Sequence, residues 1–172
     1  PKASMTQSVN TIFKKKKALG GDNTDIGGFE LSLKNINYAV KDKKIFILGA
    51  GGVAPSIILG LKRSGATDIS ISNRSKEKIQ DLKKIHPNLK MIEWGETSDF
   101  DMIINATSLG LKNDDKIKLD FTKNGPGKLF YDIIYNPEKT NFLLQGKKLG
   151  NQIENGKMMF LYQAQLAFKI WH

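Results

Sequence analysis

A glycine-rich turn lies between a short apolar run and a stretch with helical character. The apolar run is Ile45–Leu48, the turn is Gly49–Gly52, and the helical stretch is Val53–Ser64. Backbone N–H groups at the start of a helix, with the positive end of its dipole, favour a bound phosphate. A second strand, expected at Asp68–Ser72, would complete a strand–helix–strand unit of the kind that binds dinucleotides.

The glycine pattern is weak on its own, because glycines that follow a strand often form nothing more than a turn. Here Ala54 stands where the last glycine of the full fingerprint would be. The end of the second strand is more informative. It reads Asn73-Arg74-Ser75, without the acid that usually holds the ribose 2′-hydroxyl of NAD. A guanidinium can instead bind a 2′-phosphate through two parallel hydrogen bonds, so the sequence predicts NADP as the cofactor.

Arginine is rare in this chain, which strengthens the interpretation of Arg74. Of the 27 basic residues, only Arg63 and Arg74 are arginine. One of the two therefore stands where planar phosphate recognition would require it. The alternative is an ordinary solvated arginine at the start of a helix.

The composition is that of an ordinary globular protein, with 172 residues, 40% hydrophobic and 26% charged. No apolar run approaches the roughly 20 residues that cross a bilayer, so we expect no membrane contact. The absence of cysteine excludes disulfides and fits a cytoplasmic location. We expect His86 and His172 to be surface residues, and we expect no metal site.

The formal net charge of +10 raises nucleic-acid binding as an alternative. The densest basic run is Lys14–Lys17, which we expect at the tip of a hairpin as a solvated turn. The other lysines are scattered, and no aromatic-rich face accompanies them. We therefore expect no nucleic-acid partner. The positive electrostatic field of the protein would instead help to attract an anionic cofactor and a carboxylate substrate.

Strands alternate with helices along the chain, which predicts an α/β fold with a doubly wound, Rossmann-like parallel sheet. Apart from the elements above, we expect strands at Leu89–Trp94, Asp101–Ala106, Leu129–Ile134 and Asn151–Glu154, and helices at Ser75–Ile85 and Glu138–Lys148. Pro1–Ser8 has no strong pattern of helix or strand, and we expect no regular structure in Lys112–Gly127. A hairpin of Val9–Phe13 and Ala18–Asn23 would precede a helix that runs from Thr24-Asp25 to about Val40. Gly27 and Gly28 in that helix would suit close approach of its backbone to a ligand.

Several motifs occur in one order over essentially the whole chain, and together they resemble shikimate dehydrogenase. These motifs are Ser8-Val9-Asn10-Thr11, Gly21-Asp22-Asn23-Thr24-Asp25, Gly49-Ala50-Gly51-Gly52, Asn73-Arg74-Ser75, Asn105-Ala106-Thr107-Ser108-Leu109-Gly110, Tyr131–Pro137, Asn155-Gly156 and Met159–Ala164. The family interconverts 3-dehydroshikimate and shikimate with NADP, in the pathway to chorismate and the aromatic amino acids. The resemblance therefore implies an oxidoreductase whose substrate is shikimate or 3-dehydroshikimate.

The resemblance also implies roles for individual residues. Asp25 matches the catalytic aspartate, although an acid at a helix start would satisfy propensity equally well. The residues that match substrate-binding positions are Asn10, Asp25, Tyr135 and Gln163. Those that match cofactor-binding positions are Gly49, Ala50, Gly51, Gly52, Val53, Asn73, Arg74, Ser75, Thr107, Ser108, Ile133 and Gly156. For most of them the alternative is structural: a polar residue facing solvent, a tyrosine at a strand end, a core isoleucine or a helix-start glycine.

One departure from the family is important, because its catalytic lysine lies roughly 20 residues before Val-Asn-Thr. Lys2 is too close to Asn10 to match that lysine, so we expect most of the amino-terminal substrate domain to be missing and this chain to be weakly active or inactive alone. Residues 1–24 would be the tail of the substrate domain with its remnant hairpin, 25–155 the NADP-binding domain, and 156–172 a helix returning towards the substrate domain. We expect the protein to be a monomer or a homodimer.

Two alternatives remain open from the sequence. The first is a quinate/shikimate dehydrogenase paralogue, which could prefer NAD, against the indication of Arg74. The second is a Rossmann-like module without catalysis, which would use its positive charge to bind RNA or a protein partner.

Overall fold

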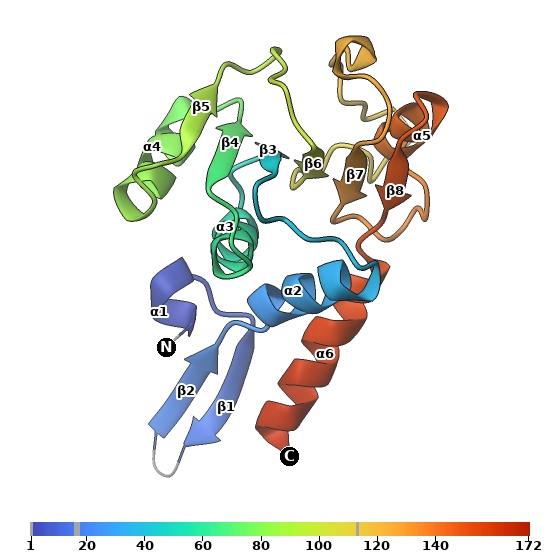
Figure 1. The fold of residues 1–172 in the computed structure, drawn as a ribbon. Coiled ribbons are helices and arrows are strands. Elements are labelled where there is room, and N and C mark those ends of the chain that lie inside the picture. Colours follow the sequence, from blue (N-terminus) through green and yellow to red (C-terminus); the bar gives the residue numbers. More distant parts are fainter. Residues whose placement is uncertain (1, 16–17, 113) are drawn as a thin grey trace.

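The computed structural model describes residues 2–15, 18–112 and 114–172, and its centre is a six-stranded parallel sheet (Figure 1). The strand order is β5-β4-β3-β6-β7-β8, which reverses direction between β3 and β6. The strands are β3 (Lys44–Leu48), β4 (Asp68–Ser72), β5 (Lys90–Ile92), β6 (Met102–Asn105), β7 (Leu129–Asp132) and β8 (Gln152–Glu154). The predicted doubly wound α/β fold is confirmed, and ligands of such sheets bind where the strand order reverses.

Central strands of this sheet carry apolar side chains on both faces because both faces are covered. In β3, Ile45 and Ile47 contribute to one core, while Phe46 and Leu48 contribute to the other. The first core lies under four helices, α2 (Asp25–Asn35), α3 (Ala54–Arg63), α4 (Lys76–Ile85) and α6 (Lys157–Trp171).

The second core is rich in phenylalanine and is covered by α5 (Asn141–Lys148) and by irregular chain. In the segment predicted to lack regular structure, the described residues form one short 3-10 turn, η1 (Thr122–Asn124). Its Ile117, Leu119 and Phe121 are buried against the sheet, so this segment covers a face that a helix covers elsewhere. The Phe121 ring packs edge-on against Phe130 at a centroid distance of 5.3 Å.

Helix α2 is shorter than predicted, because it ends at Asn35 rather than near Val40. Asn37 has a φ of 53°, a left-handed conformation that breaks the helix. The expectation that Gly28 lets a ligand approach is also wrong. A Cβ at Gly28 would lie 2.7 Å from the Met159 carbonyl oxygen, so the missing side chain allows α6 to pack directly on α2.

The amino-terminal part of the chain lies outside the sheet, on the side of α2, α3 and α6 (Figure 1). It comprises α1 (Lys2–Thr6), which the sequence did not predict, and an antiparallel hairpin of β1 (Thr11–Lys15) and β2 (Ala18–Asp22). The basic tip predicted at Lys14–Lys17 falls partly on residues 16–17, which lie outside the described residues. The indole N–H of Trp171 donates to the carbonyl of Ile12 at 2.9 Å, which joins the hairpin to α6.

His86 is not the surface residue that the sequence predicted. Its side chain is buried at the end of α4, and its Nδ1 lies 3.3 Å from Nζ of Lys62 on α3. The two helices end next to each other, which encloses the imidazole. Burial, assisted by the charge of Lys62, lowers the pKa of His86 below its usual value.

Candidate functional site

Loops from four strands meet at the carboxyl edge of the sheet around a cavity of about 290 Å³. Six of the predicted cofactor residues line it: Gly49, Gly51, Asn73, Arg74, Thr107 and Ser108. Ala106, Leu109, Lys78 and Trp94 complete the wall, and the last two belong to none of the motifs singled out from the sequence. Three other predicted cofactor residues, Ala50, Gly52 and Ser75, do not line this cavity.

The glycine turn is held in shape by close contacts of its backbone. Gly49 has a φ of 103°, and a Cβ there would lie 2.7 Å from the carbonyl oxygen of Ala106. Oδ1 of Asn73 accepts the N–H of Ala50 at 3.1 Å, and its Nδ2 donates to the carbonyl of Ser75 at 2.9 Å. Asn73 therefore fixes the turn after β3 relative to the end of β4.

Two basic side chains at this cavity have no anionic partner within the part of the chain that the structure describes. Arg74 and Lys78 form no ion pair there, whereas neighbouring Lys76 pairs with Glu93 at 2.8 Å. The carboxylate of Glu77 accepts the hydroxyl of Ser75 at 2.7 Å. The nearby acids are thus occupied, and two cations remain available to an anionic ligand. Lys78 could have been found from its position four residues after Arg74.

A second cavity, of about 240 Å³, lies between the start of α2 and the side of α6. It brings together all four predicted substrate residues and three predicted cofactor residues. Its lining consists of Asn10, Asp25, Val53, Ile133, Tyr135, Gly156, Met159, Phe160 and Gln163. The ring of Tyr135 stacks on that of Phe160 with centroids 4.8 Å apart.

Hydrogen bonds fix the polar side chains of this second cavity. Oδ1 of Asn10 accepts the backbone N–H of Thr24 at 2.9 Å, and the Thr24 hydroxyl lies 3.2 Å from the same oxygen. That hydroxyl is also 3.3 Å from Oε1 of Gln163. Burial raises the pKa of the neighbouring Asp25 carboxyl, and a hydrogen bond from Asn10 partly opposes that rise.

A third cavity, of about 500 Å³, lies between the other two. It shares Thr107 and Ser108 with the first cavity, and Ile133 and Tyr135 with the second. The three spaces therefore follow one another along the carboxyl edge, from Arg74 to Asp25. This path begins at two unpaired cations, passes a helix amino terminus and ends at a carboxyl group, which suits an extended phosphate-bearing molecule.

Comparison with known proteins agrees with this geometry. A family model described as "Shikimate / quinate 5-dehydrogenase" matches residues 30–132, more than half of the chain. The chain belongs to this family.

Relatives and solved structures of this family cover nearly the whole chain. The chain is 56% identical to the NADP(+) shikimate dehydrogenase of Pelagibacter ubique. The match covers 99% of this chain and 64% of that relative. The crystal structure of shikimate dehydrogenase from Aquifex aeolicus matches with a TM-score of 0.87 and 33% identity, over 99% of this chain and 63% of that one. Shikimate 5-dehydrogenase from Thermus thermophilus, in complex with NADP(H) and shikimate, matches with a TM-score of 0.88 and 28% identity. That match covers 99% of this chain and 64% of the Thermus chain.

A buried polar network supports the family's Asn-Ala-Thr-Ser loop, and the sequence did not predict it. Oδ1 of Asn105 accepts the Thr107 hydroxyl at 2.7 Å, and its Nδ2 donates to Asp132 at 3.0 Å. The other oxygen of Asp132 accepts the hydroxyl of Thr140 at 2.6 Å, and its first oxygen also accepts the N–H of Ile134. Asp132 thereby joins the loops after β6 and β7, the two loops that line the third cavity. Burial raises its pKa to about 6.

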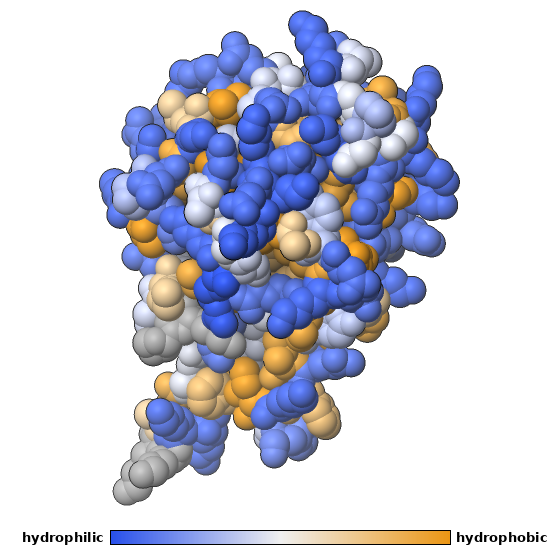
Figure 2. Space-filling view, in the orientation of Figure 1, coloured by the Kyte–Doolittle hydropathy of each residue, from blue (hydrophilic) through white to orange (hydrophobic). Residues whose placement is uncertain are grey.

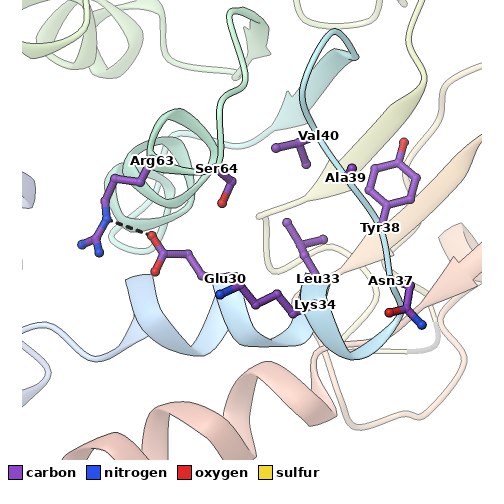
Figure 3. A pocket seen from close by; sticks show the side chains of 9 residues that line it. All are labelled: Glu30, Leu33, Lys34, Asn37, Tyr38, Ala39, Val40, Arg63 and Ser64. Atoms are coloured by element: carbon purple, nitrogen blue, oxygen red, sulfur yellow. Dashed lines mark ion pairs between the residues drawn. The ribbon is translucent and has the colours of Figure 1, made fainter.

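A fourth cavity, of about 670 Å³, lies elsewhere in this family member. It opens between the ends of α2 and α3, where the chain approaches the amino ends of the strands (Figure 3). Leu33 and Val40 form its apolar part, and Glu30 pairs with Arg63 at 3.0 Å beside it. It contains none of the predicted site residues, so Arg63, unlike Arg74, lies away from the carboxyl edge.

Within the described ranges, His, Asp and Glu side chains form no group of three or more that could hold a metal ion. None of the described helices combines the length and apolar character that a bilayer crossing needs.

Proposed function

We propose that this chain is the NADP-binding and Asp25-bearing portion of a shikimate dehydrogenase. The observation that carries the proposal is the continuous path from Arg74 to Asp25 along the carboxyl edge of the sheet. A dinucleotide with a 2′-phosphate is an extended anion with charge at one end and its redox-active ring at the other. The path offers free cations at one end and a carboxyl group at the other, which supports this assignment.

The first cavity would hold the adenosine end of NADP. Arg74 and Lys78 would pair with the 2′-phosphate, and Trp94 offers an aromatic surface next to them. The pyrophosphate would accept backbone N–H groups of the turn at Gly49–Gly52, before the start of α3. Thr107, Ser108 and Ile133 would then guide the molecule towards the second cavity.

The second cavity would hold the nicotinamide beside the substrate. NADP supplies or accepts the hydride at the oxidised carbon of shikimate. Asp25 would exchange a proton with the oxygen on that carbon. Burial raises the pKa of its carboxyl group above that of an ordinary aspartate, and so brings the pKa nearer to neutral pH. Asn10 and Gln163, which are held by Thr24, would position the hydroxyl groups of the substrate.

Turnover belongs to a protein that also carries the family's catalytic lysine, which we expect ahead of Asn10 in sequence. The chain spans 64% of the Pelagibacter relative, so cofactor binding tests the proposal more directly than turnover. The proposal includes shikimate as substrate, a cytoplasmic location, and a monomer or homodimer. It also places the boundaries between substrate-domain, cofactor-domain and carboxyl-terminal parts after residues 24 and 155.

The test is a calorimetric titration of the chain with NADPH and, separately, with NADH. We expect clear preference for NADPH, and we expect Arg74→Ala to weaken NADPH binding by roughly 10- to 100-fold, the effect of losing a charge-assisted hydrogen bond worth about 1.5–3 kcal/mol. NADH affinity should change little, because NADH has no 2′-phosphate.

The chain's other arginine is a matched control. Arg63→Ala removes the same charge at the cavity of Figure 3, away from the proposed cofactor path, and should leave NADPH affinity unchanged. Equal loss of NADPH affinity in both variants would show a general effect of charge and would contradict a specific phosphate site at Arg74.

A further inference from the structure

Asn23 is completely buried two residues before Asp25 and does not line the cavities of the proposed site. Its Oδ1 accepts the backbone N–H of Asp25 at 3.1 Å. Its Nδ2 donates to the hydroxyl of Ser56 at 2.9 Å and to the carbonyl of Ser8 at 3.1 Å, and it lies 3.3 Å from the Thr6 hydroxyl. One amide group therefore contacts α1, the chain before β1, α2 and α3.

The start of α2 depends on this amide. Thr24 is the residue before the helix, and its side chain makes no capping hydrogen bond. The first N–H groups of a helix have no partner within the helix and need one from outside. For Asp25 that partner is Asn23, so the direction of the first turn of α2 follows the position of Asn23.

Ser56 links the same amide to the helix that follows the glycine turn. It is fully buried in α3, which begins at Ala54, and its hydroxyl accepts a hydrogen bond from Asn23, two residues before the start of α2. Further along α2, Glu30 pairs with Arg63, the last residue of α3 (Figure 3). The two helices are thus also joined at the middle of α2, and the Asn23–Ser56 hydrogen bond lies nearer to Asp25.

We propose that Asn23 is a positioning residue, which holds Asp25 in the second cavity by joining the start of α2 to α3 through Ser56. The catalytic meaning of this position rests on the proposed function, whereas the contact itself does not. A shift of α3 on cofactor binding would pass through Ser56 and Asn23 to the carboxyl group that exchanges the proton.

The test is carbon-13 NMR titration of the Asp25 carboxyl group in the full chain and in three variants. Asn23→Ala removes the amide, and Ser56→Ala removes only the α3 hydroxyl, which is the milder change if Asn23→Ala fails to fold. Glu30→Gln is the matched control, because it weakens an α2–α3 ion pair that lies five residues further along α2 than Asp25. Thermal unfolding of each variant separates general loss of stability from local change.

We expect Asn23→Ala and Ser56→Ala to lower the Asp25 pKa towards its ordinary value, because a loosened first turn lets water reach the carboxyl group. Glu30→Gln should leave that pKa unchanged. An unchanged Asp25 pKa in folded Asn23→Ala and Ser56→Ala, or an equal change in Glu30→Gln, would overturn the proposal. A change in Asn23→Ala alone would overturn the link to α3. If NADPH fails to bind the unmodified chain, the proposed function fails, while the result for Asp25 remains interpretable.

Discussion

Asp132 shows how a single buried residue can serve a site that it does not line. Its carboxyl group is fully buried and accepts hydrogen bonds from Asn105, Ile134 and Thr140. Those donors favour the charged form, but burial has the larger effect and raises the pKa from 3.8 to about 6. Folding therefore favours the protonated form of this group.

This shift predicts a pH dependence of stability. Between about pH 4 and pH 6 the unfolded chain releases the Asp132 proton while the folded chain keeps it, so the free energy of unfolding should fall as pH rises. A difference of about two pH units corresponds to about 3 kcal/mol. Asp132→Asn keeps a neutral amide at this position and should remove that part of the pH dependence.

The measurement is urea unfolding of both proteins from pH 4 to pH 7. The difference between them isolates Asp132 from Asp25, whose pKa is also raised, and from His86, whose pKa is lowered. Parallel stability curves for the two proteins would show that Asp132 titrates at the same pH in the folded and unfolded states.

At the residue scale, the motifs singled out side chains that line cavities of the folded chain. Arg74 lines the first cavity, Asp25 and Gln163 line the second, and their roles there stay predictions. Lys78 was missed although it lies four residues after Arg74, and Trp94 was missed because a tryptophan after a short strand has no pattern of its own. Asp132 was missed because its role depends on Asn105 and Thr140, which approach it only in the folded chain.

At the scale of elements, α2 is packed between α3 and α6 and carries Asp25 at its first turn. Its contact with α6 depends on Gly28, since a Cβ there would also lie 2.9 Å from the backbone nitrogen of Gln163. Neither that nitrogen nor the Met159 carbonyl can move without moving α6. The packing of these helices therefore sets the distance between Asp25 and Gln163.

We expect Gly28→Ala to destabilise the chain by about 1–2 kcal/mol, because the clash of overpacking outweighs the better helix propensity of alanine. Gly27→Ala is the control in the same helix. Its Cβ would meet only the flexible end of Leu166, which can move aside, so its stability should stay near that of the unmodified chain or rise slightly. Chemical unfolding of both variants measures the difference. Equal stability of the two would mean that α2 and α6 are not in close backbone contact.

The sequence predicted most elements to within a few residues, and its errors have physical causes. Helix α2 ended early because Asn37 adopts a left-handed conformation, which asparagine permits but does not require. The cover over the second core was not predicted because Ile117, Leu119 and Phe121 follow neither helical nor strand periodicity. Their burial comes from the shape of the phenylalanine-rich face that they meet.

At the scale of the whole molecule, the site lies along one edge of the sheet and ends beside α6. Hydrophilic residues cover most of the face in Figure 2, and hydrophobic side chains gather towards its lower part. Phe160, Leu161, Phe168 and Trp171 of α6 are among the exposed large hydrophobic residues. At the other end of the path, Arg74 and Lys78 bring two cations to its entrance, neither of which has an ion-pair partner among the described residues.

The central claim is that NADP lies along this path from Arg74 to Asp25. The most direct measurement is the change in backbone amide NMR signals when NADP+ is added to the chain. We predict changes at the turn Gly49–Gly52, at Arg74 and Lys78, at Thr107–Ser108, and at Ile133–Tyr135, with little change at Asn37–Val40 beside the cavity of Figure 3. Changes confined to Asn37–Val40, or no change at saturating NADP+, would contradict the account.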